Sequence, residues 1–123
     1  MSLWTIILVD EVEDWFLELC KNDPDSGELV EAAINTLELE GPNLGRPLVD
    51  RIKGSTYHNM KELRPGSAGN TEIRILFAFD PVRQAILLVA GDKTGNWKGW
   101  YEQHIPIADK RYEEHLKELK GQQ

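Results

Sequence analysis

The sequence has a single cysteine, Cys20, and no apolar run as long as the roughly 18 residues that a membrane helix requires. Because one cysteine cannot form an internal disulfide, the disulfide-rich secreted class is excluded and a reducing, cytoplasmic setting is expected. We expect no signal peptide, since acidic residues rather than a cleavage site follow the first apolar run. One cysteine and three scattered histidines cannot supply the ligands of a zinc finger. We therefore expect no metal and no cofactor.

Basic residues are also scarce, with 14 of them against 21 acids and a net charge of −7, which is unfavourable for a nucleic-acid-binding protein. The charge is unevenly distributed. Residues 1–42 hold eleven acids and one base, whereas residues 43–104 hold nine bases and six acids. The middle of the chain could present a positive face to phosphate, although two solvated surfaces of opposite sign would give the same counts. The length predicts one domain over residues 1–123.

The spacing of apolar residues predicts an α+β fold. Residues 4–9 form a β-rich run of strand length, and apolar residues recur at helical spacing within 12–19 and 29–37. The polar break at 22–27 predicts that these two helices form an antiparallel hairpin packed on a sheet. Asp10 is expected to cap the first helix.

The rest of the chain predicts an antiparallel meander of about three further strands, over 56–64, 72–80 and 84–90. A loop rich in glycine and proline is expected at 41–54. C-terminal helices follow, a short one at 97–104 and a longer one that begins near Pro106, where a helix start tolerates proline. The predicted order is a strand, a helical hairpin, the meander and these helices.

Common catalytic motifs are missing from the sequence. Glycines 91, 95 and 99 lack the spacing of a nucleotide-binding loop, and there is no Gly-x-Ser-x-Gly elbow. Cys20 lies on an apolar-rich helix, where a buried, inert thiol is expected. The acids fall mostly on outer helix faces, so no pair of carboxylates indicates general acid–base chemistry.

Several cations lie on or beside the predicted strands. Side chains alternate along a strand, so Arg74 emerges on the face opposite to Ile73 and Ile75. Lys61 shares that face in one of two registers, and Lys93 is placed to hang over one end of it. Together these cations predict an open, positively charged concavity.

Aromatic residues follow at helical spacing, with Trp97, Trp100 and Tyr101 expected at the rim of the concavity. Cations beside flat rings suit single-stranded nucleic acid, which offers phosphates and bases that stack. The alternative is that Arg74 pairs with an acid such as Glu62 and that the tryptophans belong to the core.

RNA could be cut at such a site without a metal. Attack by the RNA's own 2′-hydroxyl needs a base, an acid for the leaving 5′-oxygen and cations around the phosphorane. Lysine, arginine and tyrosine can share these tasks. His58 and His104 are further candidates for proton transfer, although lone histidines more often lie at the surface or in hydrogen bonds.

These residues carry a family resemblance. Lys-Glu-Leu-Arg at 61–64, Glu-Ile-Arg-Ile-Leu-Phe-Ala-Phe at 72–79 and Ile-Leu-Leu-Val-Ala-Gly-Asp-Lys at 86–93 resemble the RelE/ParE toxin superfamily. Residues 97–116 look like its phage-derived HigB branch. The resemblance implies a small RelE-like α+β toxin that enters the ribosome and cleaves mRNA there. It also implies a cognate helix-turn-helix antitoxin as a partner.

The resemblance also implies roles for single residues. Arg74 resembles an arginine that stabilises the transition-state phosphate, Lys61 and Arg64 resemble basic residues that hold the RNA backbone, and Tyr101 lies near a tyrosine that assists proton transfer. The candidate catalytic residues are therefore Arg74, Lys93, Lys61 and Tyr101. The candidate RNA-binding residues are Arg64, Lys98, Trp97, Trp100 and His104.

Two other interpretations stay open, because the chain is acidic and its C-terminal helix is longer than in small members of the superfamily. One is a gyrase-inhibitor-like toxin that binds a protein and cuts no RNA. The other is an inactive phage-derived protein that binds only its antitoxin. Convergence of Arg74, Lys61 and Lys93 on one exposed concave face would favour the nuclease, whereas closure of the site by residues 97–104 would favour a binding protein.

Overall fold

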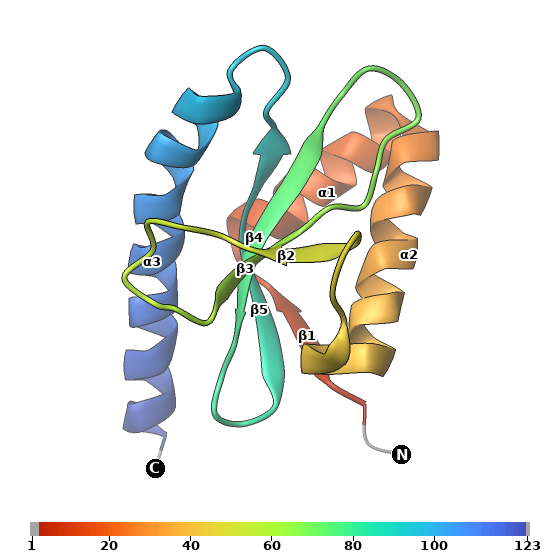
Figure 1. Cartoon of the computed structure of the whole chain (residues 1–123). Coiled ribbons are helices and arrows are strands. Elements are labelled where there is room, and N and C mark those ends of the chain that lie inside the picture. Colours follow the sequence, from red (N-terminus) through yellow and green to blue (C-terminus); the bar gives the residue numbers. More distant parts are fainter. Residues whose placement is uncertain (1–2, 123) are drawn as a thin grey trace.

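The computed structural model describes residues 3–122, which form a five-stranded sheet between two helical layers (Figure 1). The elements are β1 (Thr5–Leu8), α1 (Asp10–Asn22), α2 (Pro24–Glu40), a short 3₁₀ turn (Gly41–Asn43), β2 (Val49–Arg51), β3 (Met60–Leu63), β4 (Ile73–Phe79), β5 (Gln84–Asp92) and α3 (Trp97–Gly121). In the sheet the strand order is β1-β5-β4-β3-β2, with β1 parallel to β5 and the other pairs antiparallel. The predicted α+β fold is confirmed. No helix in the described part is both long and apolar enough to cross a membrane.

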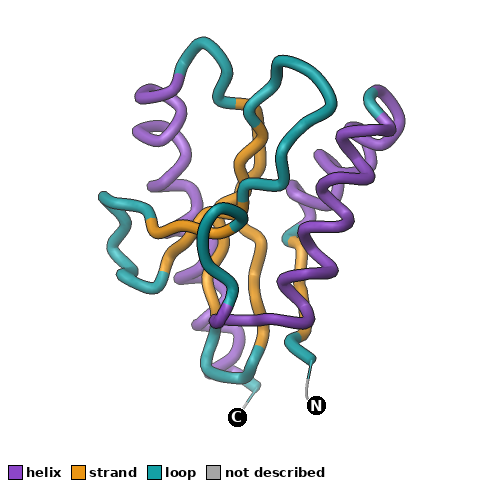
Figure 2. The backbone as a smooth tube through the Cα atoms, turned by 45° about the vertical axis from the view of Figure 1, so that its right-hand side comes forward, coloured by secondary structure: helices purple, strands orange, loops and turns teal. Residues whose placement is uncertain are grey.

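Each face of the sheet packs against its own helical layer. α1 and α2 run side by side over one face, and α3 covers the other (Figure 2). The alternation predicted along β4 is confirmed, because Ile75 and Phe77 belong to the core under α1 and α2 while Leu76 and Ala78 belong to the core under α3. Arg74 follows the same alternation and lies on the α3 face.

The helical hairpin has a single residue between its helices. Asp23 accepts a hydrogen bond from the backbone N–H of Ser26 at 3.3 Å and caps α2, and Pro24 occupies the first turn where its missing N–H costs nothing. At the hairpin, a Cβ on Gly27 would lie 2.8 Å from Cys20 Sγ, so the two helices approach closely only because this residue is glycine. The predicted cap of α1 was wrong. Val9 is the N-cap and makes no side-chain bond, whereas Asp10 lies inside the first turn, where its charge complements the helix dipole.

The sequence prediction differed from the structure in two further elements. The expected loop at 41–54 contains β2, a three-residue edge strand paired with β3 in the register Arg51↔Lys61. The two expected C-terminal helices are one continuous helix, α3, with Pro106 inside it. An interior proline removes a backbone hydrogen bond and costs about 3 kcal/mol. Burial of four α3 side chains against the sheet offsets this cost, those of Trp100, Ile105, Ala108 and Tyr112.

Candidate functional site

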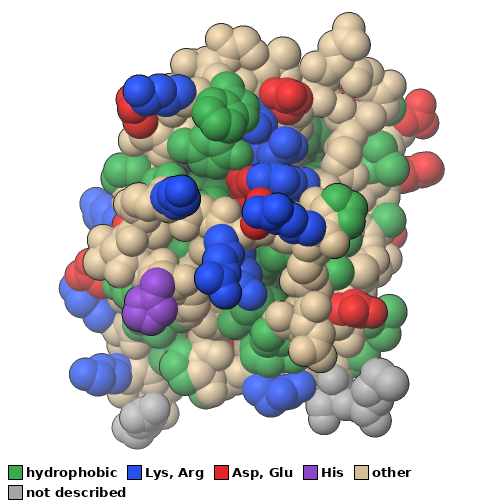
Figure 3. All heavy atoms as spheres, viewed as in Figure 1, with side chains coloured by type: hydrophobic (Ala, Val, Ile, Leu, Met, Phe, Trp, Pro, Cys, Tyr) green, Lys and Arg blue, Asp and Glu red, His purple; other side chains and the backbone are tan. Residues whose placement is uncertain are grey.

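A cleft of about 920 Å³ lies between β2, β3 and the N-terminal half of α3. Its lining brings together residues 46–54, the polar end of β3 and one side of α3, including Arg46, Asp50, Arg51, Lys53, Glu62, Arg64, Trp97, Lys98 and Tyr101. In the space-filling view, Lys and Arg side chains form a band down the middle of this face (Figure 3). The acidic chain therefore presents a locally basic surface, as its uneven charge predicted.

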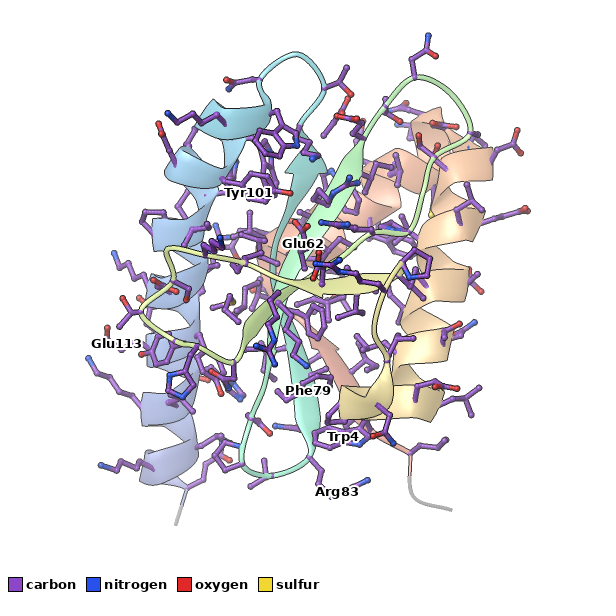
Figure 4. The ribbon with its side chains drawn as sticks, in the orientation of Figure 1. Trp4, Glu62, Phe79, Arg83, Tyr101 and Glu113 are labelled. Carbon is purple, nitrogen blue, oxygen red and sulfur yellow. The ribbon has the colours of Figure 1, made fainter. Side chains whose placement is uncertain are left out.

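The carboxylate of Glu62 lies at the floor of the cleft and is only 2% exposed. Glu62 pairs with Leu76 in the β3–β4 ladder, so it points to the α3 face of the sheet. One of its oxygens accepts bonds from Arg64 Nε at 2.8 Å and Nη2 at 2.7 Å, and the other accepts the Tyr101 hydroxyl at 2.5 Å (Figure 4). Burial, followed by the bond and charge of Glu62, raises the pKa of Tyr101 to about 12.

A second carboxylate extends this network to the edge of the sheet. Asp50 Oδ2 lies 3.2 Å from Arg64 Nη2, and Asp50 Oδ1 lies 3.2 Å from Arg46 Nε. The backbone N–H of Arg51 also donates to Asp50, and this bond, with those of Arg46, lowers the pKa of Asp50 below its ordinary value. The chain of alternating charges fixes the orientation of Arg64, so its guanidinium is already committed to protein carboxylates.

Arg74, in contrast, has no carboxylate partner in the described part of the chain. Its Nη1 donates to the carbonyl of Ile73 at 2.8 Å, and its buried Nε has no hydrogen-bond partner among residues 3–122. The guanidinium lies close enough to the Tyr101 phenol to oppose the rise in that group's pKa. A buried donor without a partner costs about 1–3 kcal/mol. Arg74 does not itself line the cleft but lies close to Tyr101, which does, so a polar ligand would reach this donor only after the side chains that cover it move.

Lys93 lies beside Arg74 and is only 4% exposed. Its ammonium sits over the ring of Trp97 at 4.8 Å and over that of Tyr101 at 5.4 Å. Burial, and then the charge of Arg74, lowers the pKa of Lys93. Two neighbouring cations without a carboxylate within 4.0 Å in the described part are therefore held under the first turns of α3.

The structure brings most of the candidate residues together but separates Lys61 from them. Lys61 pairs with Phe77, and its ammonium lies 5.4 Å from the ring centroid of Phe79, on the α1 and α2 face of the sheet. Of the two registers that the sequence left open, the structure has the one that turns Lys61 away from Arg74, so Lys61 does not converge with the other candidate catalytic residues. The side chains of Arg64, Lys98 and Tyr101 do lie at the cleft.

The aromatic candidates separate in the same way. Trp97 is 61% exposed and available at the rim, whereas Trp100 is 5% exposed and belongs to the core under α3, so its expected place at the rim is wrong. His104 stacks on Trp100 at 4.5 Å, and its Nδ1 lies 2.7 Å from the Trp100 carbonyl. The rings of Trp100 and His104 lie on the side of α3 that packs on the sheet, whereas Trp97 and Tyr101 lie on the side toward the cleft.

Sequence reasoning missed the partners of Glu62. It weighed this residue only as a salt-bridge partner of Arg74, whereas the carboxylate binds Arg64 and Tyr101. The available signal was the alternation of the strand, which places Glu62 on the same face as Met60, where a buried charge must have partners.

Comparison with known proteins identifies the family. A family model described as "Phage derived protein Gp49-like (DUF891)" matches residues 15–113. A Mycobacterium tuberculosis protein named "Putative toxin HigB3" is 59% identical over 111 residues, covering 90% of this chain and 92% of that protein. Another, "Putative toxin HigB2" of the same organism, is 56% identical over 108 residues, covering 88% of this chain and 52% of that protein. The chain thus spans about half the length of this second relative. It belongs to the phage-derived Gp49-like family and is HigB-like within it.

Proposed function

We propose that this protein is the toxin of a toxin–antitoxin pair and cleaves mRNA on the ribosome, without a metal, by attack of the RNA's own 2′-hydroxyl. The names of the two similar Mycobacterium tuberculosis proteins support a function as a toxin. One observation carries the activity: the guanidinium of Arg74, with a buried and unpartnered Nε, lies next to Lys93 and close to Tyr101, and Tyr101 lines a cleft rich in cations. Positive charge held in place before the reaction is what a phosphorane needs.

We assign the removal of the 2′-hydroxyl proton to the pair formed by Tyr101 and Glu62. A phenol with a pKa of about 12 is almost fully protonated at neutral pH, so Tyr101 is a weak base by itself. Its O–H already points at the Glu62 carboxylate. When the 2′-hydroxyl gives its proton to the phenol oxygen, the phenol proton passes to Glu62. The 2′-oxygen then attacks phosphorus, and the products are a 2′,3′-cyclic phosphate and a 5′-oxygen that leaves.

The leaving 5′-oxygen needs a proton, and we assign its donation to the ammonium of Lys93. Burial and the charge of Arg74 lower the pKa of Lys93, which makes the ammonium a better acid than an exposed lysine. General acid–base catalysis of this kind contributes about 10²–10⁴-fold to a rate. Arg74 stays protonated throughout and stabilises the equatorial oxygens.

Two residues at the rim suit the nucleotides beside the cleavage position. The exposed ring of Trp97 offers a face on which a base can stack, and Lys98 follows it at the lining of the cleft. Lys93 must lose part of its aromatic cover when RNA enters, because both Trp97 and Tyr101 lie against its ammonium.

The test is primer extension on an mRNA in a cell-free translation reaction, with purified wild-type protein and Arg74→Ala. We expect cuts at fixed positions that require ribosomes, and a loss of about 10²–10³-fold in Arg74→Ala, as for removal of one transition-state donor. Arg74→Lys, which keeps the charge without the planar fork, should recover only part of the activity. Lys110→Ala, an exposed change elsewhere on α3, is the matched control.

Intact mRNA at high concentrations of folded protein would overturn the nuclease proposal. The cover that Trp97 and Tyr101 give to Lys93 favours the second candidate, a non-catalytic toxin that acts by binding a protein such as gyrase. In that case gyrase supercoiling assays would be the next measurement. In both cases we expect a helix-turn-helix antitoxin to copurify with the toxin and to neutralise it.

A further inference from the structure

Lys61 and Arg83 are cations for which the cleft gives no role. Neither has a carboxylate within 4.0 Å among residues 3–122, whereas Arg46 and Arg64 at the cleft are both paired. Figure 4 shows Arg83 at the opposite end of the sheet from Glu62 and Tyr101. Both cations therefore lie outside the candidate active site without a carboxylate partner in the described part of the chain, as do surface lysines such as Lys110.

These two cations are seated on a pair of touching aromatic rings. The guanidinium of Arg83 lies 4.6 Å from the ring centroid of Trp4, and the ammonium of Lys61 lies 5.4 Å from that of Phe79. The rings of Trp4 and Phe79 meet edge to face at 4.9 Å (Figure 4). The result is a row of cation, ring, ring and cation across the end of β4, and both rings are only partly buried.

The backbone at Arg83, in the turn between β4 and β5, has a positive φ. Arg83 has a φ of 64°, the left-handed conformation that glycine adopts more readily in a turn such as that between β4 and β5. Strain at a non-glycine residue is characteristic of functional positions. A glycine here would relieve the strain and lose the cation over Trp4.

A second hollow, of about 390 Å³, connects this row to the cleft. Lys61 lines it, and Arg46, Asp50 and Arg51 line both it and the cleft. The two hollows therefore lie on either side of the short edge strand β2. An extended chain that leaves the cleft can cross this edge and reach Lys61, since β2 is the last strand of the sheet.

We propose that Lys61, Phe79, Trp4 and Arg83 form a second subsite, which binds the single-stranded RNA that continues out of the cleft across β2. This proposal rests on the proposed function, because it takes RNA as the ligand. Unpaired cations suit successive phosphates, and when the cations turn toward the phosphates the ring faces beneath them become available to bases. The acidic helices α1 and α2 flank the subsite, and their negative charge repels RNA from the rest of this face of the sheet.

The test measures binding of fluorescent RNA by anisotropy, with every 2′-hydroxyl methylated so that no cut can occur. A strand of about 4 nucleotides reports on one site, and a strand of about 12 nucleotides is long enough to reach a second. We expect wild-type protein to bind the longer strand more tightly, and the double variant Lys61→Ala/Arg83→Ala to bind both strands equally. The slope of log K against log salt for the longer strand should fall by about 1.4, at roughly 0.7 per phosphate contact.

The matched control is Lys110→Ala/Lys117→Ala, which removes two exposed cations from α3 and should keep the preference for length. Thermal unfolding of every variant checks that the fold is intact. If wild-type protein binds neither strand and cuts no mRNA, this proposal falls with the proposed function. If it cuts mRNA but the Lys61 and Arg83 variant keeps the preference for length, the second subsite alone is overturned. An equal loss of binding to an RNA duplex would also overturn it, because a duplex does not offer unstacked bases.

Discussion

The bond between Tyr101 and Glu62 can be tested apart from any activity through Glu62→Gln. This change keeps the shape of the side chain and removes its charge. Burial raises the pKa of Tyr101 first, and the hydrogen bond and charge of Glu62 add to it, for a value of about 12 against the ordinary 10.0. Without that charge, burial still raises the pKa of Tyr101 and the Arg74 guanidinium still lowers it, so we expect the pKa to fall below about 12. Each unit of that fall corresponds to about 1.4 kcal/mol.

The same substitution has a calculable effect on stability. The carboxylate accepts bonds from Arg64 on one oxygen and from Tyr101 on the other, and an amide has only one acceptor oxygen. One buried donor therefore loses its acceptor, which costs about 1–3 kcal/mol. For a chain of this length the melting temperature should fall by roughly 3–10 °C.

The pKa is measured by NMR, from the Cζ chemical shift of ¹³C-labelled tyrosine as the pH is raised. Glu102→Gln, a change at the exposed residue that directly follows Tyr101 in α3, is the control and should leave the Tyr101 titration unchanged. An unchanged pKa in folded Glu62→Gln would refute both the bond and the proton relay built on it. If mRNA cleavage is observed, the variant should also lose activity while it still binds uncleavable RNA.

Three further predictions concern Lys93, Gly91 and Asp80. Burial and a neighbouring guanidinium lower the pKa of Lys93, so its ammonium destabilises the fold at neutral pH, and wild-type stability should rise with pH from the lowered value toward 10.5. Lys93→Met should remove that dependence, raise stability at pH 7 by on the order of 1 kcal/mol and abolish cleavage, as measured by urea unfolding and primer extension. Gly91→Ala places a Cβ 2.9 Å from Trp100 Nε1 and should cost about 1–3 kcal/mol in thermal unfolding. Burial raises the pKa of Asp80, but hydrogen bonds from His115 and from the β4–β5 turn outweigh burial, so the pKa lies below the ordinary 3.8. The ionised Asp80 therefore stabilises the fold above pH 3.8, and this contribution is lost as the pH falls below that value. Asp80→Asn should therefore flatten the acid limb of the unfolding curve, and an unchanged limb would contradict this assignment.

Much of the fold was predictable because its elements are amphipathic. The alternation of Ile73, Ile75 and Phe77 in β4 fixed which face meets the helical hairpin, and Asp23 with Pro24 marked the break between its helices. β2 was not predictable, since three residues carry no periodicity and the strand exists only through its pairing with β3. The continuity of α3 through Pro106 depends on tertiary burial, which overrides the local preference of proline.

For the candidate site, the sequence predicted the direction of a side chain where the neighbouring residues of the same strand determine it. Arg74 had to leave the sheet opposite its apolar neighbours, and it does. Lys61 depended on the β3 register, which is set by pairing with two other strands. Trp97 and Trp100 have equal aromatic character, and only the rotation of α3 against the sheet decides that one is exposed and the other buried.

The distribution of charge in and beside the cleft decides where so acidic a chain could attract the phosphate that the proposed function requires. Glu62 and Asp50 neutralise Arg64 and Arg46, so these four side chains build a rigid wall with little net charge. Arg74 and Lys93 have no carboxylate within 4.0 Å among residues 3–122, and burial, followed by the charge of Arg74, lowers the pKa of Lys93. In the proposed reaction, a phosphate bound beside these two cations would replace their repulsion by two attractions. A phosphorane carries more negative charge than the phosphodiester from which it forms, so this binding would strengthen as the reaction proceeds.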